Sequence, residues 1–363
     1  MSPSRPEARQ QSPGGTRSVR APVRRWRLFW VLAIVLVGVV GFLAWKRVGM
    51  LDLPSVSGSM TFADSGLEDL NRDQNIDAYL RASEPTTALE ALELSADERA
   101  AVEQVRRGLD HVRNGEPDLG LQEMQGGMRR APGNLVLGNA YRMSVFQMQR
   151  AFLRQASVAS QLTPPFPQHL RGEPIAFLEA LHQESGAREV NLQLALAWVD
   201  QMLMFPALEI KAPASVESVR ILSEILQDSP GYVPALFARG LNHLHRPARL
   251  VWPESESTRP DAAAQDIGRC IAIGRRFDAG TPRLKALLAV ALGDAYIKAG
   301  RYGVARSWWQ IAQNLSRDEV IQEMVRRRYG WGDAEALDRL EEDLDRSRLH
   351  LDVPMTDLAF VWS

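Results

Sequence analysis

Small and aromatic residues follow one another at helical spacings in the last quarter of the chain, and this pattern constrains the fold more than any other feature. Gly293, Ala305 and Ala312 carry little or no side chain, so two antiparallel helices that bring them together can approach closely. Tyr296 and Trp309 are placed to fill the space between those helices. The stretch therefore predicts a tightly packed helical hairpin.

Residues 286–319, which contain this pattern, resemble a tetratricopeptide repeat, a helix–turn–helix unit of about 34 residues. The pair Leu292-Gly293 adds to the resemblance, whereas Arg317 stands where the family closes its repeat with a proline. Repeats of this family stack into a superhelix that binds other proteins and carries no chemistry of its own. The resemblance implies a protein-binding scaffold.

A second unit of the same kind is expected at about residues 101–134. The spacing from Gly108 to Pro132 equals that from Gly293 to Arg317, as one repeating unit predicts. A third trace follows Pro230, and the rest of the chain between residues 67 and 350 shows helical patterns separated by Pro and Gly, without a convincing strand pattern. We therefore expect an all-α, TPR-like helical-repeat superhelix over residues 67–350.

The N-terminal part predicts a membrane anchor. Residues 1–27 hold seven arginines against one acid and are rich in Ser, Pro and Gly, a composition typical of a disordered basic tail. Residues 28–45 are eighteen uncharged, mostly aliphatic residues. As a helix they measure about 27 Å, close to the hydrocarbon thickness of a bilayer. Trp26, Trp30 and Trp45 lie at the ends of this run, where indole rings favour the headgroup region.

The alternative to this single transmembrane helix is a cleaved signal peptide. The run ends Phe42-Leu43-Ala44-Trp45-Lys46, which offers no small-x-small cleavage site. The only cysteine, Cys270, lies far along the chain, which excludes lipid attachment near the membrane. Because more basic residues precede the run than follow it, we expect a signal-anchor in a bacterial inner membrane, with the N-terminus cytoplasmic and the C-terminal domain periplasmic.

Two connecting segments complete the predicted organisation. Residues 46–66 are expected to be a linker, and residues 351–363 an apolar C-terminal tail that includes Leu358, Phe360 and Trp362. Because exposing such side chains to water is unfavourable, we expect the tail to pack on the helical domain, either over its groove or on its outer face. Recognition of the tail by a partner is the alternative.

The inward faces of the first helices of the repeats are expected to line a partner-binding groove. In the register above, this groove contains Val105, Leu109, Arg113, Asn139, Met143, Phe146, Phe237, Leu241, Asp294, Ile297 and Lys298. The set is mostly apolar, so it suits an apolar ligand or a groove that is already covered. Alternatively, the register slips in the degenerate units and these are core positions.

Four residues with side-chain oxygens, at positions 69 to 77, have a spacing that resembles a metal site. Asp69, Asn71, Asp73 and Asp77 follow the alternate spacing of calcium-binding loops, but Gln74 stands where such loops need a glycine. A polar helix start capped by an Asp is the expectation here. The six histidines show no metal-ligand spacing, and no phosphate-binding loop or nucleophile elbow is present, so we expect neither an enzyme nor a cofactor.

The charge of the chain is divided unequally. Residues 48–363 carry a net charge of −9, although the whole chain stands at −1. An acidic domain without a basic cluster argues against nucleic acid as a partner. The expected function is a non-enzymatic membrane-anchored scaffold that binds other envelope or membrane proteins. The alternative is a periplasmic accessory protein that binds a small apolar ligand for a transport system.

Overall fold

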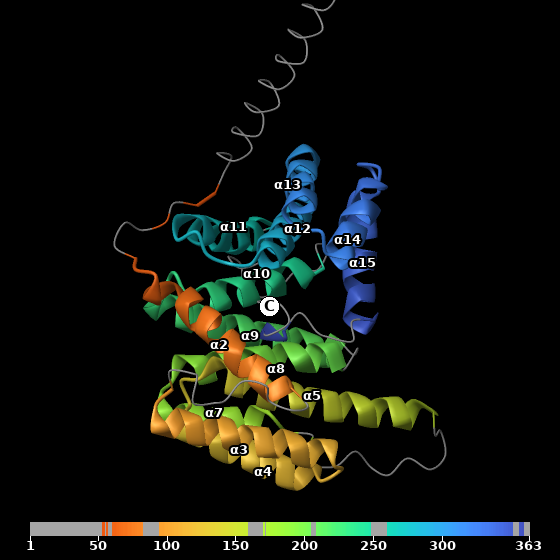
Figure 1. Cartoon of the computed structure of the whole chain (residues 1–363). Helices are drawn as coiled ribbons and strands as arrows, with labels where there is room; N and C mark the ends of the chain where they lie inside the picture. Colours follow the sequence, from red (N-terminus) through yellow and green to blue (C-terminus); the bar gives the residue numbers. More distant parts are fainter. Residues whose placement is uncertain are drawn as a thin grey trace, which may run out of the picture. The chain divides into compact units, whose positions relative to one another are not determined.

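The computed structural model describes residues 53–54, 56, 60–82, 94–158, 170, 172–204, 208–247, 260–350 and 356–358. Within these ranges the chain forms thirteen α-helices and no strand, which confirms the all-α prediction (Figure 1). In chain order the elements are the 3-10 helix η1 (Ala63–Ser65), α2 (Leu67–Arg81), α3 (Ala96–Arg113), α4 (Pro117–Arg130), α5 (Leu135–Val158), α7 (Ile175–Ser185), α8 (Arg188–Met204), α9 (Leu208–Asp228), α10 (Val233–His245), α11 (Pro260–Arg276), α12 (Pro282–Lys298), α13 (Tyr302–Leu315), α14 (Glu319–Tyr329) and α15 (Ala336–His350).

The predicted membrane anchor is not part of this description. The predicted cytoplasmic tail, residues 1–27, and the predicted transmembrane helix, residues 28–45, lie outside the described residues. Among the helices that are described, none combines the length and the apolar character needed to cross a bilayer. The described end of the predicted linker packs on the helical unit, where the rings of Phe62 and Phe277 lie 5.4 Å apart between centroids.

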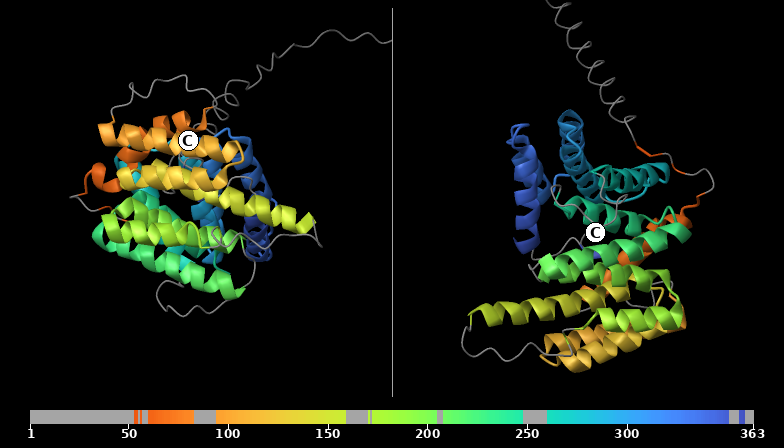
Figure 2. Two further views of the ribbon diagram at one scale, coloured as in Figure 1. Left: turned by 90° about the horizontal axis from the view of Figure 1, so that it is seen from below. Right: turned by 180° about the vertical axis from the view of Figure 1, so that it is seen from behind.

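Helices that are neighbours in the chain are mostly also neighbours in space. The pairs α3–α4, α8–α9, α10–α11 and α12–α13 make the most extensive contacts, and α4–α5, α5–α8, α9–α10, α11–α12 and α13–α14 join them into a continuous stack (Figures 1 and 2). Two helices depart from this order. Helix α2 packs on α3 and α5, and α15 packs on α10 and α12, so each bridges elements that other helices separate.

Two of the hairpins are built alike, at positions 185 residues apart. Helix α3 is followed by Gly115 and helix α12 by Gly300, both with a positive φ (85° and 71°) that glycine adopts without strain. The same three backbone hydrogen bonds close each turn, from residues 114, 115 and 116 to 110, 112 and 111, and from 299, 300 and 301 to 295, 297 and 296. The two hairpins α3–α4 and α12–α13 therefore share their spacing and turn geometry, and their assignment as repeats of one unit stays a prediction.

Small residues allow the two helices of each of these hairpins, α3–α4 and α12–α13, to approach closely. A Cβ atom added to Gly108 would lie 2.6 Å from the carbonyl oxygen of Gly120 on α4. A Cβ added to Gly293 would lie 2.5 Å from the indole of Trp309 on α13. Trp309 is only 1% exposed, and Ala305 beside it is fully buried. The predicted burial of Trp309 between the helices of the hairpin is therefore confirmed.

The residues with calcium-loop spacing belong to a helix. Asp69, Asn71, Asp73 and Asp77 all lie within α2, and a regular helical backbone does not wrap an ion as a calcium-binding loop does. Helix α2 is preceded by Gly66 and has no side-chain cap, so the predicted Asp cap is wrong. In the part of the chain that the structure describes, no three His, Cys, Asp or Glu side chains are placed to hold a metal ion.

Candidate docking site for the C-terminal segment

A short part of the C-terminal tail inserts between helices of the stack. Thr356, Asp357 and Leu358 contact side chains of α2, α5 and α8, and their exposed fractions are 6%, 4% and 3%. Residues 351–355 and 359–363 lie outside the described residues. The prediction that the tail packs on the helical domain is confirmed for these three residues.

Arg142 of α5 lies at the centre of this contact and is completely enclosed. Its guanidinium forms an ion pair with Asp200 of α8, and its Nε donates to the side-chain oxygen of Gln193 at 2.8 Å. Its Nη2 also donates to Asn139 Oδ1, one turn earlier on α5, at 3.0 Å. We call these four residues, together with Arg81 of α2, the cradle.

The cradle contacts the main chain of the docked segment at two points. Arg142 Nη2 donates to the carbonyl oxygen of Thr356. The backbone N–H of Leu358 donates to Asn139 Oδ1 at 3.1 Å. The segment, which has a turn at Thr356 and a helical residue at Leu358, is therefore bound through a donor and an acceptor of its own backbone.

The cradle also contacts the polar side chains of the segment. The hydroxyl of Thr356 donates to Asp200 Oδ1 at 2.6 Å. The carboxylate of Asp357 accepts from Asn139 Nδ2 at 2.8 Å and forms an ion pair with Arg81 at 3.2 Å. The bonds to Asp200 and from Asn139 lie in a buried site, where bonds to charged groups are stronger than neutral ones at the surface. The side chain of Arg81 is 55% exposed, so water screens its ion pair.

Burial and ion pairing have opposite effects on the pKa of two carboxylates, Asp200 of the cradle and Asp77, which is bonded to Arg81. Burial raises the pKa of Asp200, and the neighbouring Arg142 and the hydroxyl of Thr356 oppose the rise. Burial also raises the pKa of Asp77, although the hydrogen bond from Arg81 lowers it. Because an isolated buried charge is costly, this site depends on having both partners of each pair in place.

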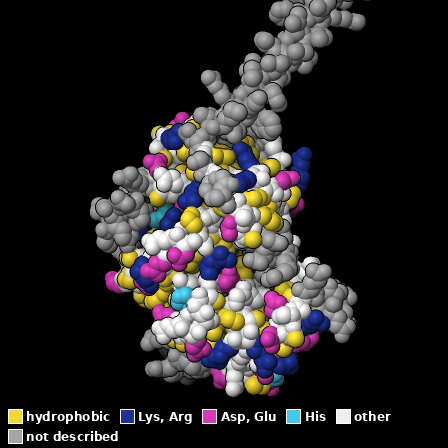
Figure 3. All heavy atoms as spheres, turned by 90° about the vertical axis from the view of Figure 1, so that its left-hand side faces the viewer, with side chains coloured by type: hydrophobic (Ala, Val, Ile, Leu, Met, Phe, Trp, Pro, Cys, Tyr) yellow, Lys and Arg dark blue, Asp and Glu magenta, His cyan; other side chains and the backbone are white. Residues whose placement is uncertain are grey.

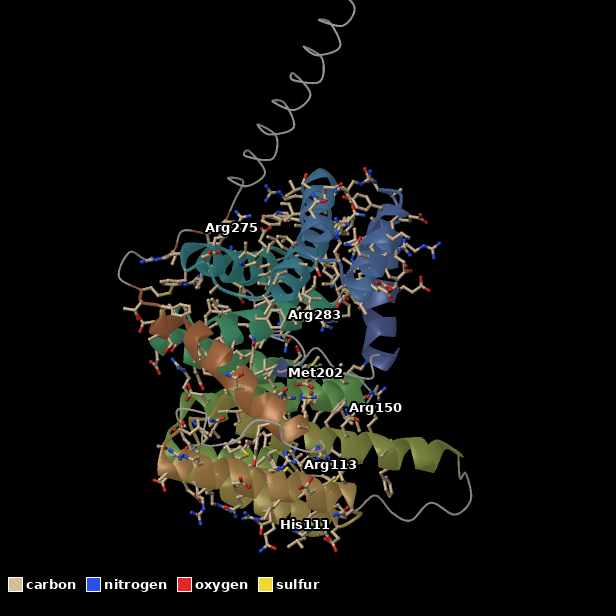
Figure 4. All side chains as sticks on the ribbon, viewed as in Figure 1. His111, Arg113, Arg150, Met202, Arg275 and Arg283 are labelled. Carbon is tan, nitrogen blue, oxygen red and sulfur yellow. The ribbon has the colours of Figure 1, made fainter. Side chains whose placement is uncertain are left out.

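The structure places most of the predicted groove residues in the interior. Asn139 belongs to the cradle. Nine more are buried or half-buried, and only Arg113, at the end of α3, is well exposed with its side chain 45% accessible (Figure 4). The buried members are Val105, Met143, Phe146, Phe237, Asp294 and Ile297, and the half-buried ones are Leu109, Leu241 and Lys298.

Asp294 and Lys298, two charged residues of the predicted groove, both lie on α12 and contact other elements. Asp294 of α12 pairs with Arg328 of α14 at 2.6 Å and accepts from Trp309 Nε1 at 3.0 Å. Lys298 donates to the carbonyl oxygen of Arg246. A role for this set as a partner-binding groove stays a prediction.

Four residues of the cradle, Arg81, Arg142, Gln193 and Asp200, are absent from the predicted site. A signal for two of them is present in the sequence. Arg142 is the only charged residue from position 135 to 149, and Asp200 is the only one from 190 to 204. Single charges of opposite sign within two otherwise uncharged stretches indicate a buried ion pair, since charged side chains are almost never buried unpaired.

Comparisons with known proteins returned no match to a family model, a curated protein or a solved structure.

Proposed function

We propose that the chain is a non-enzymatic scaffold, anchored in a bacterial inner membrane, whose TPR-like helical stack binds short segments of other envelope proteins. One observation carries this proposal: the stack holds Thr356–Leu358 through hydrogen bonds to both their backbone and their side chains. A surface that binds its own chain in this way has the chemistry to bind a similar segment of a partner.

The repeated hairpins support the same function. Copies of one helical unit, as predicted for α3–α4 and α12–α13, build extended interaction surfaces when they stack, and their stability depends on neighbouring units rather than on a bound cofactor. Basic and acidic side chains are interspersed on the face drawn in Figure 3. Such a face suits protein partners better than nucleic acid, which needs clustered Lys and Arg.

The alternative function, binding of a small apolar ligand, receives less support. Val105, Phe237 and Ile297, apolar members of the predicted set, pack in the hydrophobic core. The contacts of the cradle are hydrogen bonds and ion pairs, which are typical of peptide recognition. We therefore place protein binding first.

Site-specific photo-crosslinking in cells tests this function. A photo-reactive residue at Ala78, which is exposed on α2 between Asp77 and Tyr79, lies beside the cradle. We expect it to form discrete adducts with one or a few envelope proteins. The matched control is the same residue at Asn314, which is exposed at the end of α13.

Adducts specific to Ala78 support a partner site at the cradle. Adducts at Asn314 but not Ala78 keep the scaffold function and move the site elsewhere. Absence of protein adducts from Ala78, Asn314 and a series of other exposed positions around the stack contradicts the function.

A further inference from the structure

We infer that the cradle is a specific recognition site for a short Ser/Thr–Asp–large aliphatic segment of a second protein, and that Thr356–Leu358 occupy it as a built-in competitor. The inference rests on the proposed function and names the class of ligand. It follows from what the cradle recognises at each of three consecutive positions.

The first position requires a hydroxyl. Thr356 Oγ1 donates to Asp200, whose second oxygen is bound by Arg142. A valine of nearly the same shape would leave an oxygen of this buried carboxylate without its donor, and an unpaired buried acceptor is costly. Serine or threonine is therefore favoured over any apolar residue.

The second position requires an acid, and the third an apolar residue. Asp357 accepts from Asn139 and pairs with Arg81, so a lysine there would bring two positive charges together. Leu358 is buried with the hydrophobic core, so a charged residue there would lose its hydration. The three requirements together define a short sequence motif.

The cradle is organised independently of the segment it holds. The bonds from Arg142 to Gln193 and Asp200 join α5 to α8, its bond to Asn139 lies within α5, and none of the three involves an atom of the tail. A binding site that already has its bound geometry does not lose conformational entropy when a ligand enters. An entering segment would therefore meet a preformed site.

The described contacts do not require a chain end. They reach the backbone of Thr356 and Leu358, and Leu358 is followed by five further residues in the sequence. An internal segment of a partner protein can make the same contacts. This distinguishes the site from the backbone pockets that capture a terminal carboxylate.

The tethered tail should weaken the binding of any competitor. A segment attached by a short linker has an effective concentration in the millimolar range, so a free peptide of equal affinity competes poorly. The apparent dissociation constant of the free peptide equals its intrinsic dissociation constant divided by the fraction of cradles that the tail leaves empty. Release of the tail should therefore make the site available.

Fluorescence anisotropy with a labelled peptide tests the inference. The probe is the peptide of residues 353–363 of this chain, and the full-length chain in detergent is compared with a chain that stops after Asp352. We expect the shortened chain to bind the probe at least about tenfold more tightly than the intact chain. A full-length chain carrying Asp357→Lys provides a second way to release the tail if the shortened chain does not fold.

Variants of the probe test the motif. Replacing its threonine with valine, or its aspartate with asparagine, should each weaken binding by about tenfold. On the shortened chain, Arg81→Glu should weaken binding of the original probe. A probe with lysine in place of the aspartate should restore binding to this variant. Arg107→Glu is the matched control, since Arg107 is 56% exposed and Arg81 is 55% exposed in their side chains.

Three outcomes overturn the inference: no binding to the folded shortened chain, equal binding of a scrambled probe, or concentration-dependent dimers of the intact chain that vanish on truncation. The last would identify the occupant as the tail of a second copy. Failure of the proposed function is a separate result, because Ala78 adducts in cells can persist when the peptide does not bind. Conversely, a probe that binds without any adducts in cells would contradict the function.

Discussion

At the scale of single residues, enclosed charges connect the helices of the stack. Arg142 pairs with Asp200, and Arg328 pairs with Asp294, with all four side chains 5% exposed or less. Replacing one partner of such a pair leaves the other charge buried and costs about 3–5 kcal/mol, whereas an apolar replacement of both is often neutral. These pairs therefore specify which helices meet more than they add to stability.

His243 of α10 is a different kind of buried group, since it is held neutral. Burial lowers its pKa to about 3, and the positive charges of Arg246 and Arg239 add to the effect. Its Nδ1 has no hydrogen-bond partner among the described residues. The folded protein therefore resists protonation of this ring at pH values where an unfolded chain would accept the proton.

The first prediction concerns this histidine and pH. The stability it contributes should be complete above its unfolded pKa of about 6.5 and should be lost as the pH falls toward 3, at up to about 1.4 kcal/mol per pH unit. We expect the melting temperature of His243→Gln to depend less on pH between 7.5 and 5 than that of the unchanged protein. The control is His182→Gln, and equal pH dependence of all three proteins would contradict the prediction.

At the scale of the elements, the α12–α13 hairpin depends on a close approach at one glycine. Gly293 faces the Trp309 indole, whereas an added Cβ at Gly303 of α13 meets no other atom within 4 Å. The two positions differ in packing, although both are helical glycines of the same hairpin. They therefore form a matched pair for testing whether small residues determine the fold of this unit.

We predict opposite effects of alanine at these two positions. Gly293→Ala should destabilise the protein by about 1–3 kcal/mol through overpacking, whereas Gly303→Ala should be neutral or stabilise it by up to about 1 kcal/mol. Trp309→Ala should cost about 3–5 kcal/mol. Denaturant unfolding measures all three, and equal effects of the two alanine variants would show that the helices do not meet at Gly293.

Elements of this kind could be predicted because their signals lie close together in the sequence. Gly293 and Trp309 are sixteen residues apart, and both hairpins show the same spacing of small residues. The cradle could not be predicted in the same way, because Arg142 and Thr356 are 214 positions apart and no local pattern links them. The predicted groove residues follow from the helical register of the expected repeats. This register cannot distinguish a helix face that lines a groove from one that another helix covers.

At the scale of the whole molecule, the cradle joins distant parts of the chain. Arg81 and Asp357, which lie 276 positions apart, form an ion pair across it. Helix α2 and the docked segment both pack over helices that come between them in the sequence. Binding of the tail is therefore coupled to the packing of α2 on α5, and loss of one should loosen the other.

The proposed membrane topology makes a prediction at the same scale. If residues 28–45 span the membrane with the arginine-rich tail in the cytoplasm, a reporter that is active only in the periplasm should be active when fused after Ser363. A reporter that is active only in the cytoplasm should be inactive there. The opposite pair of results would reverse the orientation, and release of the protein from membranes by cleavage would contradict the anchor.

Amide hydrogen exchange at Leu358 tests most directly whether the stack binds residues 356–358 of its own chain in the cradle. Its N–H donates to Asn139 in a buried site, so we predict exchange at least about a hundredfold slower than in an unstructured peptide. Asp357→Lys should remove this protection while leaving the amides of α5 and α8 protected. Exchange of Leu358 at the unstructured rate in the unchanged protein would contradict the account.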